Sequence, residues 1–322
     1  MKPIIKFNLV ILIVLSFGSA FAQQLPQFTQ YMYNTVSINP AYAGSKETLY
    51  FVGLHRSQWV GLEGGPTTQT VSIHTPMRKN DQVGLGFSFM NDELGYENFV
   101  YLYADFSYTI QVGEFKHDSQ VHPIKLAFGI KGGFTHYSLD QELLNDPSIV
   151  EDLYFNDVSD RWSPNIGLGA YLHTNRWYVG LSAPRILNTD WNNSRNGQVE
   201  YVAAERISFY MTGGYVFDIA KNGETKFKPA FMVKATDGAP MSYDLSANFL
   251  FNEKFWLGAA YRFNESAGAF GGIADWQVTK EIRVGYAYEH PISDIRPYSD
   301  GTHEILLIWE PKKNRIKSPR YF

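Results

Sequence analysis

Apolar residues alternate with polar or small residues over stretches of about ten positions along most of the chain. In residues 83–89, the odd positions are Val, Leu, Phe and Phe, and the even positions are Gly, Gly and Ser. Residues 243–251 and 282–289 repeat this pattern, with charged residues among the even or intervening positions. Because successive side chains of a strand face opposite sides, each segment has one apolar face and one polar face. This is the pattern of transmembrane β-strands.

Alternation and turn residues together predict about fourteen strands. We expect them at residues 48–57, 67–75, 83–90, 99–111, 123–134, 163–173, 176–184, 206–217, 226–235, 242–251, 254–263, 267–276, 281–290 and 301–309. Only a closed barrel leaves no unpaired strand edge in lipid, and bacterial barrels have even strand numbers. The predicted fold is therefore all-β, a closed antiparallel transmembrane β-barrel with a short N-terminal plug or mouth segment.

The expected connections alternate between short and long, as they do between periplasmic turns and extracellular loops. The longest, residues 137–162 and 185–205, fall on one side, which we expect to face the cell exterior. On this scheme residues 91–98 form an outer loop and residues 113–122 a periplasmic turn. The barrel would occupy residues 48–309, and the basic tail 310–322 would lie in the periplasm.

The first residues have the features of a cleaved signal peptide. Lys2 and Lys6 precede an apolar run at 9–17 and an Ala-Phe-Ala site at 20–22, so residues 1–22 are expected to be removed. Residues 23–47 contain Pro and Gly and do not alternate, which argues against a strand. We expect them to fold in the lumen or at the periplasmic mouth, because they carry too many apolar groups for a solvated tail: Phe28, Tyr31, Met32, Tyr33, Ile38 and Tyr42.

The composition supports a membrane barrel with a filled lumen and argues against nucleic acid as a partner. Aromatic residues make up 16% of the chain, as aromatic girdles at both membrane interfaces require. A net charge of −4 gives no basic surface for nucleic acid. Predicted inward charges are mixed in sign, which favours a cross-linked lumen over an ion-selective pore: Asp105, Lys125, Lys131, Lys228, Lys234, Asp244, Arg262, Arg283 and Glu289.

No catalytic or metal-binding motif is present in the sequence. The eight His are scattered without metal-ligand spacing, there is no Cys, and no nucleophile elbow or phosphate loop occurs. We therefore expect no enzymatic activity, no cofactor and no metal site. Three glycine pairs inside predicted strands, at 132–133, 213–214 and 271–272, are expected to have structural roles.

Several sequence strings resemble the PorP/SprF family of type IX secretion and gliding proteins. The most specific are PQFTQYMYN at 26–34, INPAYAG at 38–44 and RSQWVGLEGGPTTQT at 56–70. LSAP at 181–184, GTHEI at 301–305 and the ending SPRYF at 318–322 are also similar to that family. The resemblance implies an outer-membrane barrel of the Bacteroidota without enzymatic activity or cofactor, whose partners are type IX secretion components and a surface adhesin with a type B C-terminal domain.

Partner contacts are expected in the outer loops, because loops on a rigid scaffold commonly carry binding function. The candidates are Trp59, Leu62, Glu63, Tyr154, Phe155, Trp162, Arg185 and Trp191. Trp59 and Trp162 could instead serve only as membrane-interface anchors. The alternative to secretion is an outer-membrane porin or hydrophobic-solute transporter, which would share the signal peptide, the aromatic girdles and the lipid-facing strands.

Overall fold

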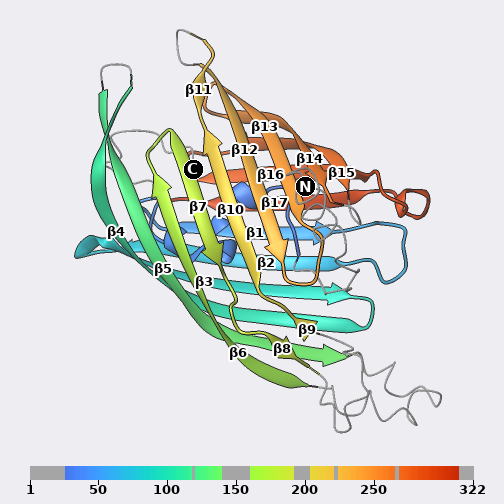
Figure 1. Cartoon of the computed structure of the whole chain (residues 1–322). Helices are drawn as coiled ribbons and strands as arrows, with labels where there is room; N and C mark the ends of the chain where they lie inside the picture. The colour runs from blue at the N-terminus through green and yellow to red at the C-terminus, as the bar shows by residue number, and fades with distance from the viewer. Residues whose placement is uncertain are drawn as a thin grey trace, which may run out of the picture.

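A closed antiparallel barrel forms the body of the protein (Figure 1). The computed structural model describes residues 26–117, 120–139, 160–191, 204–220, 224–264 and 268–311. Within these residues, fourteen strands pair in one ring, which closes where β10 pairs with β12 and β1 pairs with β17. The predicted fold class is confirmed, because each strand of the ring pairs with another strand on both sides.

The ring strands are β1 (Tyr50–Ser57), β2 (Thr67–Met77), β3 (Asn80–Leu94), β4 (Glu97–His117), β5 (Gln120–Leu139), β6 (Arg161–His173), β7 (Trp177–Ala183), β10 (Ser208–Tyr215), β12 (Thr225–Thr236), β13 (Ser242–Phe251), β14 (Phe255–Phe263), β15 (Ala269–Gln277), β16 (Ile282–Pro291) and β17 (Thr302–Trp309). The short β11 (Phe217–Asp218) follows β10 and pairs with β12. β8 (Thr189–Asp190) and β9 (Ala204–Glu205) form a separate two-stranded sheet.

The two faces of the wall are those that the alternation predicts. In β13, Tyr243, Leu245, Phe249 and Phe251 are exposed on the outside, and the intervening side chains are buried inside. Seven of the nine predicted inward charges are also buried: Asp105, Lys131, Lys228, Lys234, Asp244, Arg262 and Glu289. The outer surface is apolar, as a hydrocarbon environment requires, and the charges line the lumen.

Two predicted connections are mostly strand. β3 and β4 continue through the expected outer loop 91–98 and leave only residues 95–96 between them. At the opposite end, both strands enter the expected turn 113–122: β4 ends only at His117, and β5 begins already at Gln120. The strands thus extend past the apolar band at both ends. The connections at the β4–β5 end are short, so we assign this end to the periplasm.

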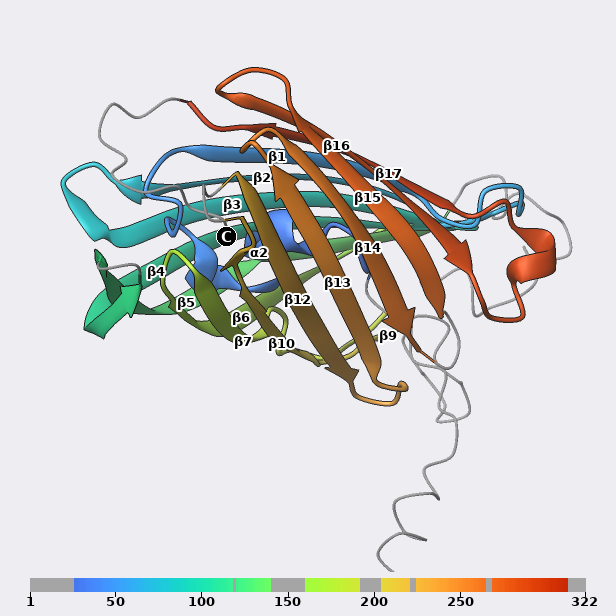
Figure 2. The same cartoon turned by 90° about the horizontal axis from the view of Figure 1, so that it is seen from above.

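Residues 26–49 lie inside the ring of strands rather than in its wall (Figure 2). We call residues 26–49 the lumen segment. It contains two 3-10 helices, η1 (Tyr31–Tyr33) and η2 (Pro40–Tyr42), and the short helix α2 (Thr35–Ile38) between them. A third 3-10 helix, η3 (Arg296–Tyr298), lies in the connection between β16 and β17. No helix in the described part of the chain is long and apolar enough to cross a membrane.

A charge on the outer face should destabilise the barrel. Leu245 lies near the middle of β13 and points outward. Leu245→Lys should cost roughly 2–4 kcal/mol of folding free energy in lipid, because the ammonium would enter hydrocarbon. Leu245→Phe, which remains apolar, should cost little. Urea titrations of both variants in vesicles test the assignment, and equal stability would contradict it.

Candidate functional site

The first half of the lumen segment packs against inward side chains of β1, β10, β12, β15, β16 and β17. Phe28, Tyr31, Met32 and Tyr33 are all buried. They belong to one apolar cluster with inward side chains of the wall: Tyr50, Val52, Leu54, Tyr210, Met232, Ile273, Ala287, Leu306 and Ile308. Burial of these large side chains stabilises the segment inside the barrel, because apolar surface is removed from water.

Two carboxylates of the wall hold the backbone and side chains of this half. Glu304 accepts hydrogen bonds from the backbone N–H groups of Thr29, at 2.7 Å, and Gln30, at 3.0 Å. Asp275 accepts from the Gln30 side-chain amide at 2.8 Å and from the Tyr33 hydroxyl at 2.6 Å. Hydrogen bonds to charged groups are stronger than neutral ones, so these contacts fix the position of η1.

The second half is held by strands on the opposite part of the ring. Wall side chains donate to backbone carbonyls of the lumen segment, and Asn39 donates to a strand carbonyl. The bonds are Lys131 Nζ to Val36 O at 3.2 Å, Ser182 Oγ to Ile38 O at 2.7 Å, Ser107 Oγ to Ala43 O at 2.7 Å and Asn39 Nδ2 to Ala170 O at 3.1 Å. The segment is therefore attached on both sides of the lumen.

Strand glycines make room for this segment. At three of them an added Cβ would lie within 2.2 Å of an atom of the segment: Gly84 against Ala43 O at 2.1 Å, Gly129 against Ala41 N at 2.2 Å and Gly169 against Asn39 Oδ1 at 2.1 Å. Any larger residue there would have to displace backbone or a hydrogen-bonded amide. The wall is thus shaped to the bound segment, with its backbone in direct contact with that of the segment.

Buried charges form a continuous network across five strands of the wall. Arg56 of β1 pairs with Glu304 of β17 and, at 3.0 Å, with Glu289 of β16. Arg262 of β14 pairs with Glu289 at 3.2 Å and with Asp244 of β13 at 2.6 Å. All five side chains are nearly inaccessible to solvent, so each charge depends on its partners for stabilisation.

The predicted partner residues in the first outer connection, residues 58–66, are accessible to solvent. Trp59 and Leu62 are partly exposed and Glu63 is exposed. The Trp59 backbone N–H donates to the Thr302 hydroxyl at 3.3 Å, which ties this connection to the start of β17. These three residues therefore lie in an accessible connection at the outer end of the barrel.

The remaining predicted partner residues differ in their accessibility. Trp162 is 58% exposed on the outside of β6. Trp191 is 1% exposed and packs with the buried ring cluster of Phe99 and Tyr137. Arg185 is also buried, with its guanidinium over a Tyr ring and in an ion pair. Tyr154 and Phe155 lie outside the described residues.

Sequence reasoning missed three charged residues that hold the lumen segment and its network: Arg56, Asp275 and Glu304. Each lies in a predicted strand, and alternation places Glu304 on the same face as the buried Leu306. Alternation was therefore the signal that could have identified them. A charged residue between two apolar, lipid-facing residues of a strand must point into the lumen. Among the described residues, no cluster of three or more His, Cys, Asp or Glu could hold a metal ion.

The family profile described as type IX secretion system membrane protein PorP/SprF matches residues 20–309. The chain belongs to the PorP/SprF family. This family consists of secretion-system membrane proteins rather than enzymes. Membership, together with the barrel, places the protein in the outer membrane as part of the type IX secretion family.

Solved structures with similar folds are distant in sequence. Outer membrane protein Omp33 of Acinetobacter baumannii has 9% identity and a TM-score of 0.44, covering 83% of this chain and 100% of its own. A porin mutant of Rhodopseudomonas blastica has 12% identity and a TM-score of 0.35, covering 82% and 99%. CdiB from A. baumannii has 8% identity and a TM-score of 0.41, covering 82% and 60%. A search of curated proteins found no match.

Proposed function

We propose that this protein assists the secretion or surface attachment of a partner protein, an adhesin with a type B C-terminal domain, and that it works without chemistry of its own. The observation that carries the proposal is the family match across residues 20–309. In this proposal the barrel is a fixed membrane platform, with type IX components and the client as its partners and a role in gliding where the client is a motility adhesin.

The packing of the lumen supports this proposal over the porin alternative. A general pore needs a continuous aqueous path, but the lumen segment is buried and hydrogen bonded to Glu304 on one side and to Ser182 on the other. The segment would have to leave for solutes to pass. Protein contact at the outer end of the barrel needs no such movement.

The outer connection at residues 58–66 and the exposed Trp162 are the contact surface that we propose for the client. Both are accessible at the outer end of the barrel. Arg185 and Trp191 are buried, so in this proposal they support the loop that carries them. Aromatic side chains commonly dominate binding energy where they fit a partner pocket.

Deletion of the gene should remove one adhesin, or a class of type B clients, from the cell surface while uptake of small solutes stays normal. The physical reason is that the client loses its membrane platform, whereas a plugged barrel contributes nothing to permeation. Protease shaving of intact cells followed by mass spectrometry measures surface display. Trp162→Ala in the restored gene should lower display of the same client several-fold.

Trp276→Ala is the matched control. Trp276 is 59% exposed on the outer wall, close to the 58% of Trp162, but it lies at the periplasmic end of β15. If both variants lower display equally, Trp162 acts as an interface anchor and not as a client contact. Normal display in the deletion strain, combined with loss of growth on one solute, would establish the transporter alternative.

A further inference from the structure

The barrel wall has a recess on its outer half between β6 and β10. β7 ends at Ala183, opposite Leu168, although β6 continues outward to Arg161. β10 pairs with β7 only from Tyr210 onward. Above Ala183, the described residues 186–190 and 204–207 take the place of ring strands between β6 and β10. The Ile186 N–H donates to Ile166 O of β6 at 2.9 Å, and β8 pairs with β9.

Directly after Ala183, Pro184 and Arg185 lie on the lumen side of the wall. Pro184 passes so close behind β6 that an added Cβ on Gly167 would lie 2.3 Å from Pro184 O. The Arg185 guanidinium lies 4.3 Å from the centre of the Tyr101 ring, on the inner face of β4, and pairs with Glu205 at 3.0 Å. These contacts hold Pro184 and Arg185 on the lumen side and leave the outer surface of the wall recessed.

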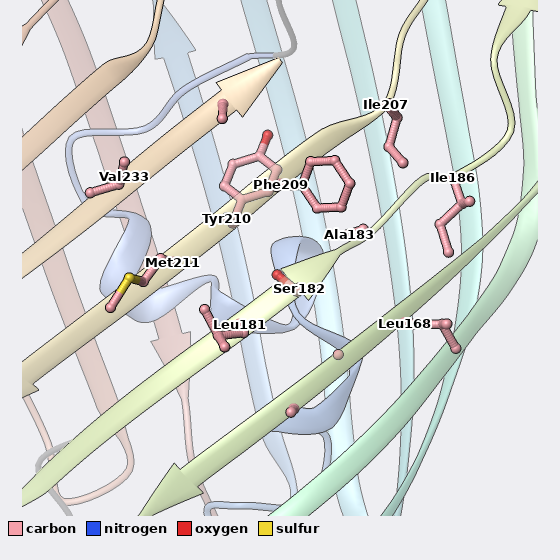
Figure 3. A pocket seen from close by; sticks show the side chains of 13 residues that line it. Leu168, Leu181, Ser182, Ala183, Ile186, Ile207, Phe209, Tyr210, Met211 and Val233 are labelled. Carbon is pink, nitrogen blue, oxygen red and sulfur yellow. The ribbon is translucent and has the colours of Figure 1, made fainter. Parts of the chain in front are cut away.

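A groove of about 690 Å³ occupies this recess (Figure 3). We call it the wall groove. Its volume lies within the range of small-molecule sites. Its lining is almost entirely apolar, with side chains from four strands and the adjoining connections: Leu168, Leu181, Ile186, Phe209, Met211 and Val233. Ser182 also lines the groove, and its hydroxyl donates to Ile38 O of the lumen segment at 2.7 Å.

The strand edges beside the wall groove are capped, which excludes a peptide strand as its occupant. Pro164 of β6 has no N–H to offer. Asn165 Oδ1 accepts from the N–H groups of Ile166, Ile186 and Leu187, at 2.9, 3.0 and 3.0 Å. Across the groove, Asn188 Oδ1 accepts from the Ile207 N–H at 2.8 Å. An added strand would find few free backbone groups with which to form a ladder.

We propose that the wall groove binds a hydrocarbon chain of an outer-leaflet membrane lipid. The groove faces the membrane, its lining is apolar, and its capped edges leave dispersion and the exclusion of water as the main sources of affinity. A lipid acyl chain is the occupant with that chemistry which the surrounding membrane supplies. Through Ser182 the bound chain would lie one hydrogen bond from the lumen segment.

Photolabelling tests this assignment on the intact protein. The protein is placed in nanodiscs that contain a trace of phospholipid with a diazirine midway along one acyl chain, and labelled peptides are identified by mass spectrometry after irradiation. Leu181 and Leu245 are both 55% exposed on the outer wall, but only Leu181 lies in the groove. The expected result is several-fold more label on Leu181 and Phe209 than on Leu245.

Leu181→Trp should fill the groove and reduce labelling of Phe209 to the level of the open wall, whereas Leu245→Trp should leave it unchanged. Heat-dependent migration on gels confirms that both variants fold. Equal labelling of Leu181 and Leu245 in the unmodified protein would overturn the proposal. Labelling of the groove by diazirine-bearing free fatty acid, but not by the phospholipid, would also overturn it.

Discussion

Deletion of residues 26–47 is expected to convert the closed barrel into a conducting pore. The lumen segment fills the interior, and its removal leaves a polar, charged surface that water can enter. Eight-stranded barrels are filled by their own side chains, whereas 16- to 18-stranded porins enclose an aqueous channel. A ring of fourteen strands lies between these cases. Planar-bilayer recordings should give a large, steady conductance for the deletion variant and little for the intact protein.

A matched pair of point variants separates plug loss from general damage. Gly129→Leu should displace the lumen segment, because a Cβ at this position would lie 2.2 Å from Ala41 N. Gly132→Leu, three residues along the same strand, should have no effect on conductance, because no atom lies within 4 Å of its Cβ position. Equal conductance of the intact and deleted proteins would show that the segment does not close the lumen.

The membrane makes the strands of this protein predictable. All fourteen expected strands overlap a strand of the ring, and β13 has the predicted bounds 242–251. Inside hydrocarbon each strand must place apolar side chains outward, so alternation in the sequence reports the fold directly. Closure follows because an open edge in lipid would leave backbone groups unpaired.

The same reasoning explains why strand ends were missed. Beyond the apolar band no face of a strand must be apolar, so the alternation ends while the backbone ladder continues. Glu93 and Asn98 form a pair in the β3–β4 hairpin although the sequence there suggests a loop. At the periplasmic end, Lys116 and Val121 pair in the same way. Hydrophobic periodicity therefore measures the membrane-embedded part of a strand rather than its full length.

The apolar residues of the lumen segment could be selected from the sequence, but their contacts could not. Gln30 and Asp275 are separated by 245 positions, and no local pattern links them. The glycines that accommodate the segment are Gly84, Gly129 and Gly169, none of which belongs to the three glycine pairs identified in the sequence. In the sequence, a strand glycine that contacts the lumen segment cannot be distinguished from a strand glycine at a bend. Only the three-dimensional structure separates the two.

The outer connection that contains Arg185 and Trp191 illustrates a second limit. Aromatic and Arg residues in a loop are suited to a partner, but they are equally suited to an interior ring cluster. Here Trp191 lies with its ring centre 5.5 Å from that of Tyr137. The strand expected at 176–184 ends near Pro184, as β7 does at Ala183, but the inward position of Arg185 depends on its tertiary contacts with Tyr101 and Glu205.

Glu304→Ala should be among the most destabilising single substitutions in the barrel. It removes the partner of Arg56 and the acceptor of the Thr29 and Gln30 N–H groups, all in a buried environment. Removing one partner of a buried ion pair costs about 3–5 kcal/mol, because the other charge stays buried. The ion pair between Arg56 and Glu289 remains in this variant and should lower the cost, because Arg56 keeps one partner. Urea unfolding in lipid vesicles, followed by Trp fluorescence, measures the change.

Two further variants identify the cause. Glu63→Ala removes an exposed carboxylate of the outer surface and should change stability by less than about 0.5 kcal/mol. Arg56→Met combined with Glu304→Leu should be less destabilising than the sum of the two single changes, because each single change leaves one buried charge without this partner, whereas the double variant removes both charges. Strict additivity would mean that Arg56 and Glu304 do not stabilise each other, and the buried network would then contribute little to holding the lumen segment in place.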